Sequence, residues 1–117
     1  MTFYNKNGEP IAYLSDDIHI YLFSGEPVAY LSNDAIFNFD GKHLGWFENG
    51  WVFDLNGERV FFTENSNGGP MKPMKQMKPM KSMKHMKPMK SIKEMKSMKS
   101  MKSSSWSSLS EKAFFNL

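Results

Sequence analysis

The first 70 residues alternate short apolar runs with short polar turns. The runs are rich in Ile, Val, Tyr, Phe and Trp, residues of high strand propensity, and the turns in Asn, Asp, Ser and Gly. This alternation predicts eight short strands in an antiparallel meander. We expect them near residues 2–6, 9–15, 18–23, 26–32, 35–39, 42–48, 51–55 and 58–64.

An internal repeat of about sixteen residues organises these strands. Four segments align: GEPIAYLSDDIHIYLFS, GEPVAYLSNDAIFNFD, GKHLGWFENGWVFDLN and GERVFFTENSNGGP. Their first glycines each end a polar pair that suits a two-residue type I′ hairpin turn. These glycines are Gly8, Gly25, Gly41 and Gly57. A second set of turns lies halfway through the units, at Asp16-Asp17, Asn33-Asp34, Asn49-Gly50 and Asn65-Ser66.

The N-terminal strand completes the set of units. FYNKNG before Gly8 resembles VFDLNG before Gly57, which is the second strand of its unit, whereas the last unit has a first strand only. Residues 2–6 should therefore pair with unit four and close a ring or barrel without exposed edges. The expected fold is all-β, with four pseudo-symmetric two-stranded units closed by the N-terminal strand.

The strands are apolar on both faces. In the first unit Ile11 and Tyr13 point one way and Ala12 and Leu14 the other, and the second unit repeats this pattern. Because a half-solvated sheet would alternate apolar with polar residues, we expect another segment to cover the outside. The remainder of the chain is the nearest candidate.

Residues 71–103 form eleven Met-Lys-x triplets, in which Ile92 once replaces methionine. Only a helix with three residues per turn, polyproline II, places all methionines on one ridge and all lysines on another. Pro73, Pro79 and Pro88 favour it, whereas the proline-free part from Lys90 to Ser103 leaves an α-helix open. We expect an extended, polyproline-II-like tail.

Length limits where this tail goes. Thirty-three residues at about 3.1 Å each span roughly 100 Å, so the tail must wrap, project, or pair with a second copy. An exposed row of methionines is costly. We therefore expect the methionine ridge to pack on the outer faces of the β-units, with the lysines reaching the acidic loops.

Residues 104–117 differ again in composition. Ser108-Leu109-Ser110-Glu111 fits a capping box for a short helix. Trp106, Leu109 and Phe115 are candidate anchors, although an unordered end stays open. Three segments result: a β domain at 1–70, the triplet tail at 71–103 and an anchor segment at 104–117.

The repeats, the GGP at Gly68 to Pro70, the lysine triplets and the terminal WSSLSEKAFF together resemble the bacterial four-fold β-flower domain family. The resemblance covers nearly the whole chain and implies the fold. Because this family carries no established activity, it implies no site. Unit four departs from the pattern, with Phe61 where the other units have Ala or Gly and Arg59 in place of proline, so we expect only approximate symmetry.

Charge divides the chain into two opposite parts. Through Pro70 ten acidic residues outnumber three basic ones, for a net −7, whereas from Met71 onward twelve lysines oppose two glutamates, for +10. Such asymmetry marks an interaction tail, and mutual neutralisation is the simplest use of it. The N-terminus lacks the pattern of a signal peptide and no apolar run would span a membrane, so we expect a cytoplasmic protein.

Little in the sequence points to catalysis. The chain has no cysteine, and its three histidines, His19, His43 and His85, show no metal spacing. Methionines at MxxM spacing suggest Cu(I) only weakly, because a lysine follows each one. We predict no enzyme, no cofactor and no metal site.

Two binding sites remain as hypotheses. Equivalent aromatic residues of the four units could surround a common axis as a cage for a cationic or planar ligand; they are Tyr13, Tyr30, Trp46 and Phe62. The tail lysines could hold nucleic acid or an anionic membrane; they are Lys72, Lys75, Lys78, Lys81, Lys84, Lys87, Lys90, Lys93, Lys96, Lys99 and Lys102. The leading expectation is a non-enzymatic structural or interaction module, with anion binding and small-ligand binding as alternatives.

Overall fold

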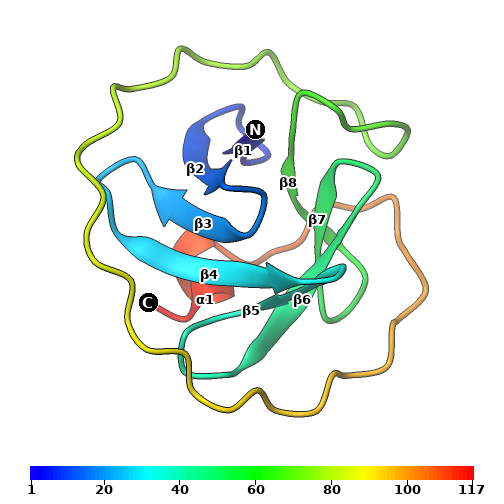
Figure 1. The fold of residues 1–117 in the computed structure, drawn as a ribbon. Helices are drawn as coiled ribbons and strands as arrows, with labels where there is room; N and C mark the ends of the chain where they lie inside the picture. The colour runs from blue at the N-terminus through cyan, green and yellow to red at the C-terminus, as the bar shows by residue number, and fades with distance from the viewer.

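Eight antiparallel strands follow one another around a closed barrel in chain order (Figure 1). The computed structural model describes all residues, 1–117. The predicted meander is confirmed, with strands shortened where turn residues occupy their ends. The strands are β1 (Thr2–Tyr4), β2 (Pro10–Ser15), β3 (His19–Leu22), β4 (Pro27–Ser32), β5 (Ala35–Phe37), β6 (His43–Glu48), β7 (Trp51–Asp54) and β8 (Arg59–Phe62).

The N-terminal strand closes the barrel, as the repeat predicts. β1 pairs with β2 on one side and, through Tyr4 opposite Phe62, with β8 on the other. Both edges of the meander are therefore paired, which removes the exposed edges that invite aggregation.

The two sets of turns differ from the prediction in type. At the repeat glycines only the glycine has a positive φ, +96° at Gly25 for example, and a bulge follows in each of these four hairpins. The expected type I′ turn needs positive φ at two successive residues. That geometry occurs in the other set, at Asp16-Asp17 and Asn49-Gly50.

The interior of the barrel is filled by alternate residues of the strands. Ala12, Ala29 and Phe61 occupy equivalent inward positions in their units and are almost wholly buried in one core cluster. Phe61 stacks on Phe115 with ring centroids 5.6 Å apart. The large side chain that breaks the repeat in unit four thus meets the C-terminal segment.

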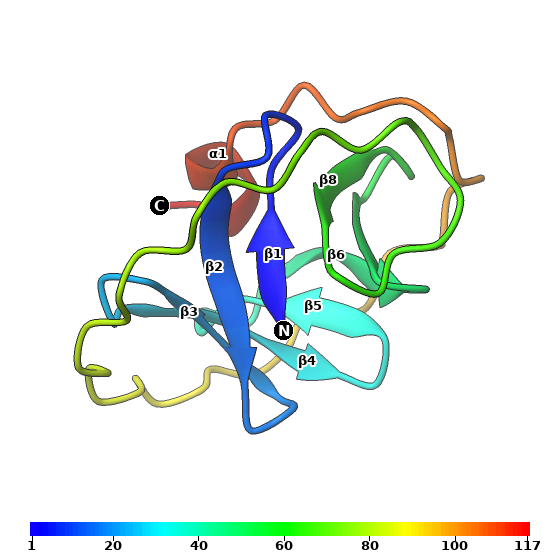
Figure 2. The same cartoon turned by 90° about the horizontal axis from the view of Figure 1, so that it is seen from above.

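A short helix, α1 (Glu111–Phe115), lies at one end of the barrel (Figure 2). Phe114 and Phe115 are buried in the core cluster, which confirms Phe115 as an anchor. The helix begins later than the predicted capping box indicates, because Ser110 and not Ser108 is the N-cap; its hydroxyl accepts from the N–H of Ala113 at 3.1 Å. Leu109 is 41% exposed and anchors little.

Residues 71–103, here called the belt, run once around the barrel. In Figure 1 they form the outer loop, yellow-green through orange, that encircles the strands. The molecule is a disc with extents of 37 × 36 × 22 Å, and a disc of that width has a circumference of about 110 Å, close to the roughly 100 Å contour of the belt. The predicted extended structure is confirmed, since no part of the belt is helical, and of the three courses left open the belt takes the one that wraps (Figure 1).

Candidate functional site

The belt is attached to the barrel at intervals of nine residues. The backbone N–H groups of Gln76, His85, Glu94 and Ser103 donate to the carbonyl oxygens of the four repeat glycines, Gly8, Gly25, Gly41 and Gly57, at 2.8–2.9 Å. Each residue is the x of its triplet. Three triplets of belt therefore match one unit of barrel.

Close approach at these glycines explains why no side chain stands there. A Cβ at Gly25 would fall on the carbonyl oxygen of Met83, and a Cβ at Gly41 on that of Ile92. Gly8 and Gly57 meet carbonyl oxygens of the belt in the same way. The repeat glycines therefore serve the turn and the belt together.

A second contact lies three residues earlier in three of the four intervals; the first interval has Pro73 at this place, which has no N–H to donate. The N–H groups of Ser82 and Ser91 donate to the carbonyl oxygens of Phe23 and Phe39 at 2.8 and 2.9 Å. At the equivalent place in unit four, the hydroxyl of Ser100 donates to Leu55 at 2.9 Å. A serine at the x position thus adds a second attachment of the belt near Gly25, Gly41 and Gly57.

The methionines point away from the barrel. The eleven side chains of the methionine ring are between 89% and 96% exposed; they are Met71, Met74, Met77, Met80, Met83, Met86, Met89, Ile92, Met95, Met98 and Met101. The expectation that they pack on the β-units is wrong. A methionine turned inward would hold the belt backbone too far from the glycine carbonyls, and those hydrogen bonds satisfy backbone groups that side-chain burial would not.

The lysines cover the aromatic outer surface of the barrel. Lys81 and Lys90 lie over Tyr13 and Tyr30, each with Nζ 4.4 Å from the ring centroid, and Lys99 lies 4.8 Å from that of Trp46. Four more lysines lie over rings within 6 Å; they are Lys72, Lys84, Lys93 and Lys102. Cation–π attraction and burial of the lysine stems together shield this surface.

Three of the lysines also reach acidic loops, as predicted. Lys99 pairs with Asp34 at 2.6 Å and with Glu48, Lys102 also pairs with Glu48, and Lys78 pairs with Glu64 at 3.3 Å. Hydrogen bonds from Lys102 and Lys99 lower the pKa of Glu48, and the bond from Lys99 lowers that of Asp34. The oppositely charged parts of the chain therefore neutralise each other locally.

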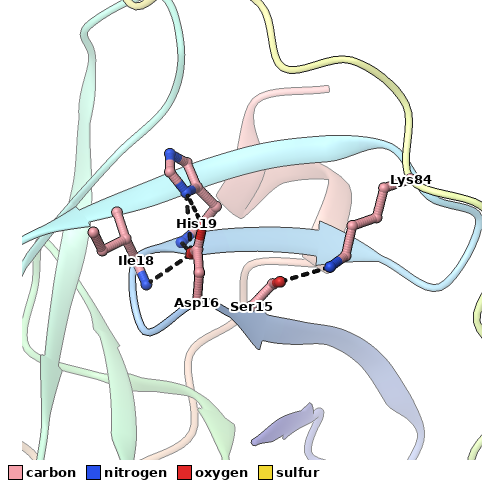
Figure 3. A network of polar contacts seen from close by, with 5 residues as sticks. All are labelled: Ser15, Asp16, Ile18, His19 and Lys84. Atoms are coloured by element: carbon pink, nitrogen blue, oxygen red, sulfur yellow. Dashed lines mark hydrogen bonds and ion pairs between the residues drawn. The ribbon is translucent and has the colours of Figure 1, made fainter.

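The hairpin after β2 shows how a lysine meets a structured turn (Figure 3). Lys84 donates to the hydroxyl of Ser15 at 2.8 Å, while the Asp16 carboxylate accepts from the N–H of His19 at 3.0 Å and its ring at 2.9 Å. The bonds from His19, with one from the N–H of Ile18, lower the pKa of Asp16 to about 2. The bonds between His19 and Asp16 therefore stabilise the hairpin turn itself.

His43 joins the barrel to the belt. Its Nε2–H donates to the carbonyl of Gly45 at 2.9 Å, and its Nδ1 accepts from the N–H of Ser97 at 3.0 Å. Its own backbone N–H donates to the Glu94 carboxylate at 2.7 Å. Burial lowers the pKa of His43, and the neutral ring is the form that accepts from Ser97.

The four aromatic residues of the hypothetical cage do not gather around one axis. Tyr13 packs with Tyr21 and Phe23, whereas Tyr30, Trp46 and Phe62 belong to a separate cluster. All four are 7% exposed or less. They lie on the outer side of the strands, because the residues that precede them in sequence occupy the inside; these are Ala12, Ala29, Gly45 and Phe61. Belt lysines cover Tyr13, Tyr30 and Trp46.

Three hollows lie around α1. One of about 350 Å³ is bounded by Leu44, Leu55 and Phe114, another of about 330 Å³ by Glu9, Phe61 and Ser108, and a third is smaller. No three His, Cys, Asp or Glu side chains are grouped to hold a metal ion. No helix has the length and apolar character needed to cross a membrane.

The three-residue period of the belt does not by itself predict its nine-residue interval, although the sequence carries a signal for it. Prolines recur at 70, 79 and 88, and serines at 82, 91 and 100. A nine-residue period beside a sixteen-residue period indicates two segments wound around a common axis in register.

A family model described as 4-fold beta flower protein matches residues 1–115. No curated protein and no solved structure gives a significant match.

Proposed function

The chain belongs to the 4-fold beta flower protein family, and from this premise we propose that it is a non-enzymatic interaction module whose methionine ring binds a partner protein. The observation that carries the proposal is the exposure of all eleven ring side chains, at 89% or more. Proteins rarely keep so many large apolar side chains in water on one continuous feature unless it is a contact surface. The cytoplasmic location predicted from the sequence stays part of the proposal.

The ring is held in place before any partner arrives. Backbone hydrogen bonds from the x residues fix the belt once in every unit, so the methionines are displayed on an ordered backbone. A partner then meets side chains whose backbone entropy is already lost, which lowers the cost of binding. The β domain serves as the scaffold for this display.

Methionine suits a surface that accepts varied shapes. Its side chain is unbranched, flexible and polarizable, and it adapts to irregular apolar contacts. A lysine follows each ring residue, so positive charge flanks the apolar atoms. The partner chemistry that fits is a surface with apolar side chains bordered by Asp or Glu.

The lysine alternative has weaker support in the geometry. Eight of the eleven belt lysines lie over an aromatic ring or pair with a carboxylate, and Lys75, Lys87 and Lys96 do neither. Binding to nucleic acid or anionic lipid would compete with these contacts. The small-ligand alternative is weaker still, because the four aromatic residues are buried and separated.

The proposal is tested with a variant in which all ten ring methionines become glutamine, which keeps an unbranched chain but removes the apolar surface. The control is Ile92→Met, which leaves the ring apolar. We expect a partner protein that the wild type and Ile92→Met retain and the glutamine variant does not. That partner should also bind the purified wild type directly.

Three results would contradict the proposal. One is equal retention of the same proteins by the wild type and both variants. Another is loss of binding only when Lys75, Lys87 and Lys96 become glutamine, with strong dependence on salt, which would favour anion binding instead. The third is the absence of any protein that distinguishes the variants.

A further inference from the structure

We propose that the methionine ring is also a modification surface, on which peroxide-class oxidants convert its ten thioethers to sulfoxides while the barrel and the belt stay folded. The consequence for partner binding, given below, rests on the proposed function. The chemistry itself does not.

Access is the first ground for this inference. Each ring methionine is 89–94% exposed, so the sulfur is open to a small oxidant from solvent. The chain contains no cysteine, and its only other methionine is Met1. No thiol in this protein therefore competes for the oxidant, and susceptibility follows exposure.

The step balances with peroxide alone. A lone pair of the thioether sulfur attacks one peroxide oxygen, the O–O bond breaks, and a new S–O bond forms. The departing hydroxide takes up the proton of the transferred oxygen and leaves as water. Sulfur loses two electrons and the peroxide gains them, and methionine sulfoxide reductases reverse the change.

The contacts of the belt explain why the fold should survive this change. Attachment runs through the backbone of the x residues and through the lysines, and the ring side chains touch little. Ile92, 96% exposed, occupies a ring position without sulfur. Sulfoxidation of a core methionine would instead place a polar group among buried apolar atoms.

Oxidation would change the one property on which the proposed function depends. A sulfoxide is polar and accepts hydrogen bonds, so ten of them would turn an apolar ring into a polar one at constant fold. If the ring binds a partner through apolar contact, oxidised protein should release that partner. Reduction should restore binding.

The test treats the full-length protein with graded hydrogen peroxide and follows intact mass and melting temperature together. We expect one oxygen for each of the ten ring methionines, in addition to one at Met1. The ring should gain its oxygens as fast as in the chain unfolded by urea, with no shift in melting temperature. The glutamine variant of the ring, treated alike, should gain oxygen at Met1 only.

Ile20→Met supplies the contrast, because Ile20 is wholly buried in the barrel core. Its added methionine should be oxidised several-fold more slowly than the ring, and its oxidation should lower the melting temperature. The inference is overturned if the ring is protected relative to the unfolded chain, or if the wild type loses stability as ring oxygens accumulate. If the folded, oxidised protein keeps its partner, the proposed function fails while the modification surface stands.

Discussion

His43 accepts a hydrogen bond at Nδ1 from the backbone N–H of Ser97. In the preceding unit, Pro27 and Pro88 line the same small cavity. Pro27 and His43 hold equivalent positions in successive units, and so do Pro88 and Ser97 in the belt. Where the barrel has the acceptor His43 in place of proline, the belt has the N–H donor Ser97 in place of proline. The belt and the barrel are therefore matched at this position of the unit.

The pairing of His43 with Ser97 predicts a coupled effect of substitution. His43→Pro removes the acceptor of the Ser97 N–H and the donor to the Glu94 carboxylate, and Ser97→Pro leaves the buried Nδ1 of His43 without a partner. Each should lower the free energy of unfolding by about 1–3 kcal/mol. The double variant reproduces the proline pair of the preceding unit, so its loss should be smaller than the sum by at least about 0.5 kcal/mol. Denaturant unfolding of all four proteins measures the coupling; strictly additive losses would show that the two positions act independently.

His43 also predicts a dependence of stability on pH. The unfolded chain takes up a proton at this residue near pH 6.5, whereas burial lowers the pKa in the folded protein. The stability that the neutral ring contributes is therefore fully present above about pH 6.5 and is lost as the pH falls through the lower folded pKa. Protonation would also remove the acceptor of Ser97.

Unfolding measured across this range should show a steeper loss in the wild type than in His43→Gln. His85→Gln removes a histidine from the belt and should retain the wild-type profile. Identical profiles for His43→Gln and the wild type would mean that another group causes the loss of stability at low pH.

Gly25 and Gly68 form a matched pair for the close approach of the belt. Both have positive φ, +96° and +67°, but a Cβ at Gly25 would meet the Met83 carbonyl, whereas at Gly68 it would meet nothing. Gly68→Ala should cost about 1 kcal/mol for the backbone conformation alone. Gly25→Ala should cost at least about twice as much by denaturant unfolding, since it also displaces the belt. Equal costs would contradict a tight contact at Gly25.

Lys99 tests whether the lysines fasten the belt. It lies over Trp46 and pairs with both Asp34 and Glu48. Lys99→Gln should lower the melting temperature, and the difference should shrink at high salt as the ion pairs of the wild type are screened. Lys87→Gln, which removes no such contact, should leave the melting temperature unchanged. Equal shifts in the two variants would point to net charge as the cause.

Much of the fold could be predicted because the same local sequence pattern recurs in each unit. Apolar runs bounded by Asn, Asp and Gly recur at a constant spacing, so one unit predicts the others, and the unmatched strand at residues 2–6 predicts closure. The three-residue period likewise predicts an extended tail. These features depend on local chemistry and counting.

The orientation of the belt could not be predicted from burial preferences alone. Methionine is the most apolar residue of each triplet, yet the x residue lies against the barrel, because its backbone N–H donates to the carbonyl of Gly25 or of an equivalent glycine. The sequence predicts lysines at the acidic loops, but seven of the eleven belt lysines lie over aromatic rings. The nine-residue spacing of prolines and serines indicates only the register between belt and barrel.

Amide hydrogen exchange along residues 71–103 tests the central claim most directly, namely that the x residues bind the barrel and the methionines face solvent. The amides of Gln76, Ser82, His85, Ser91, Glu94 and Ser103 donate to barrel carbonyls. They should exchange slowly, while the amides of the ring methionines exchange at nearly the rate of an unfolded chain. Uniformly fast exchange along the belt, or protection at the methionines instead, would contradict the account.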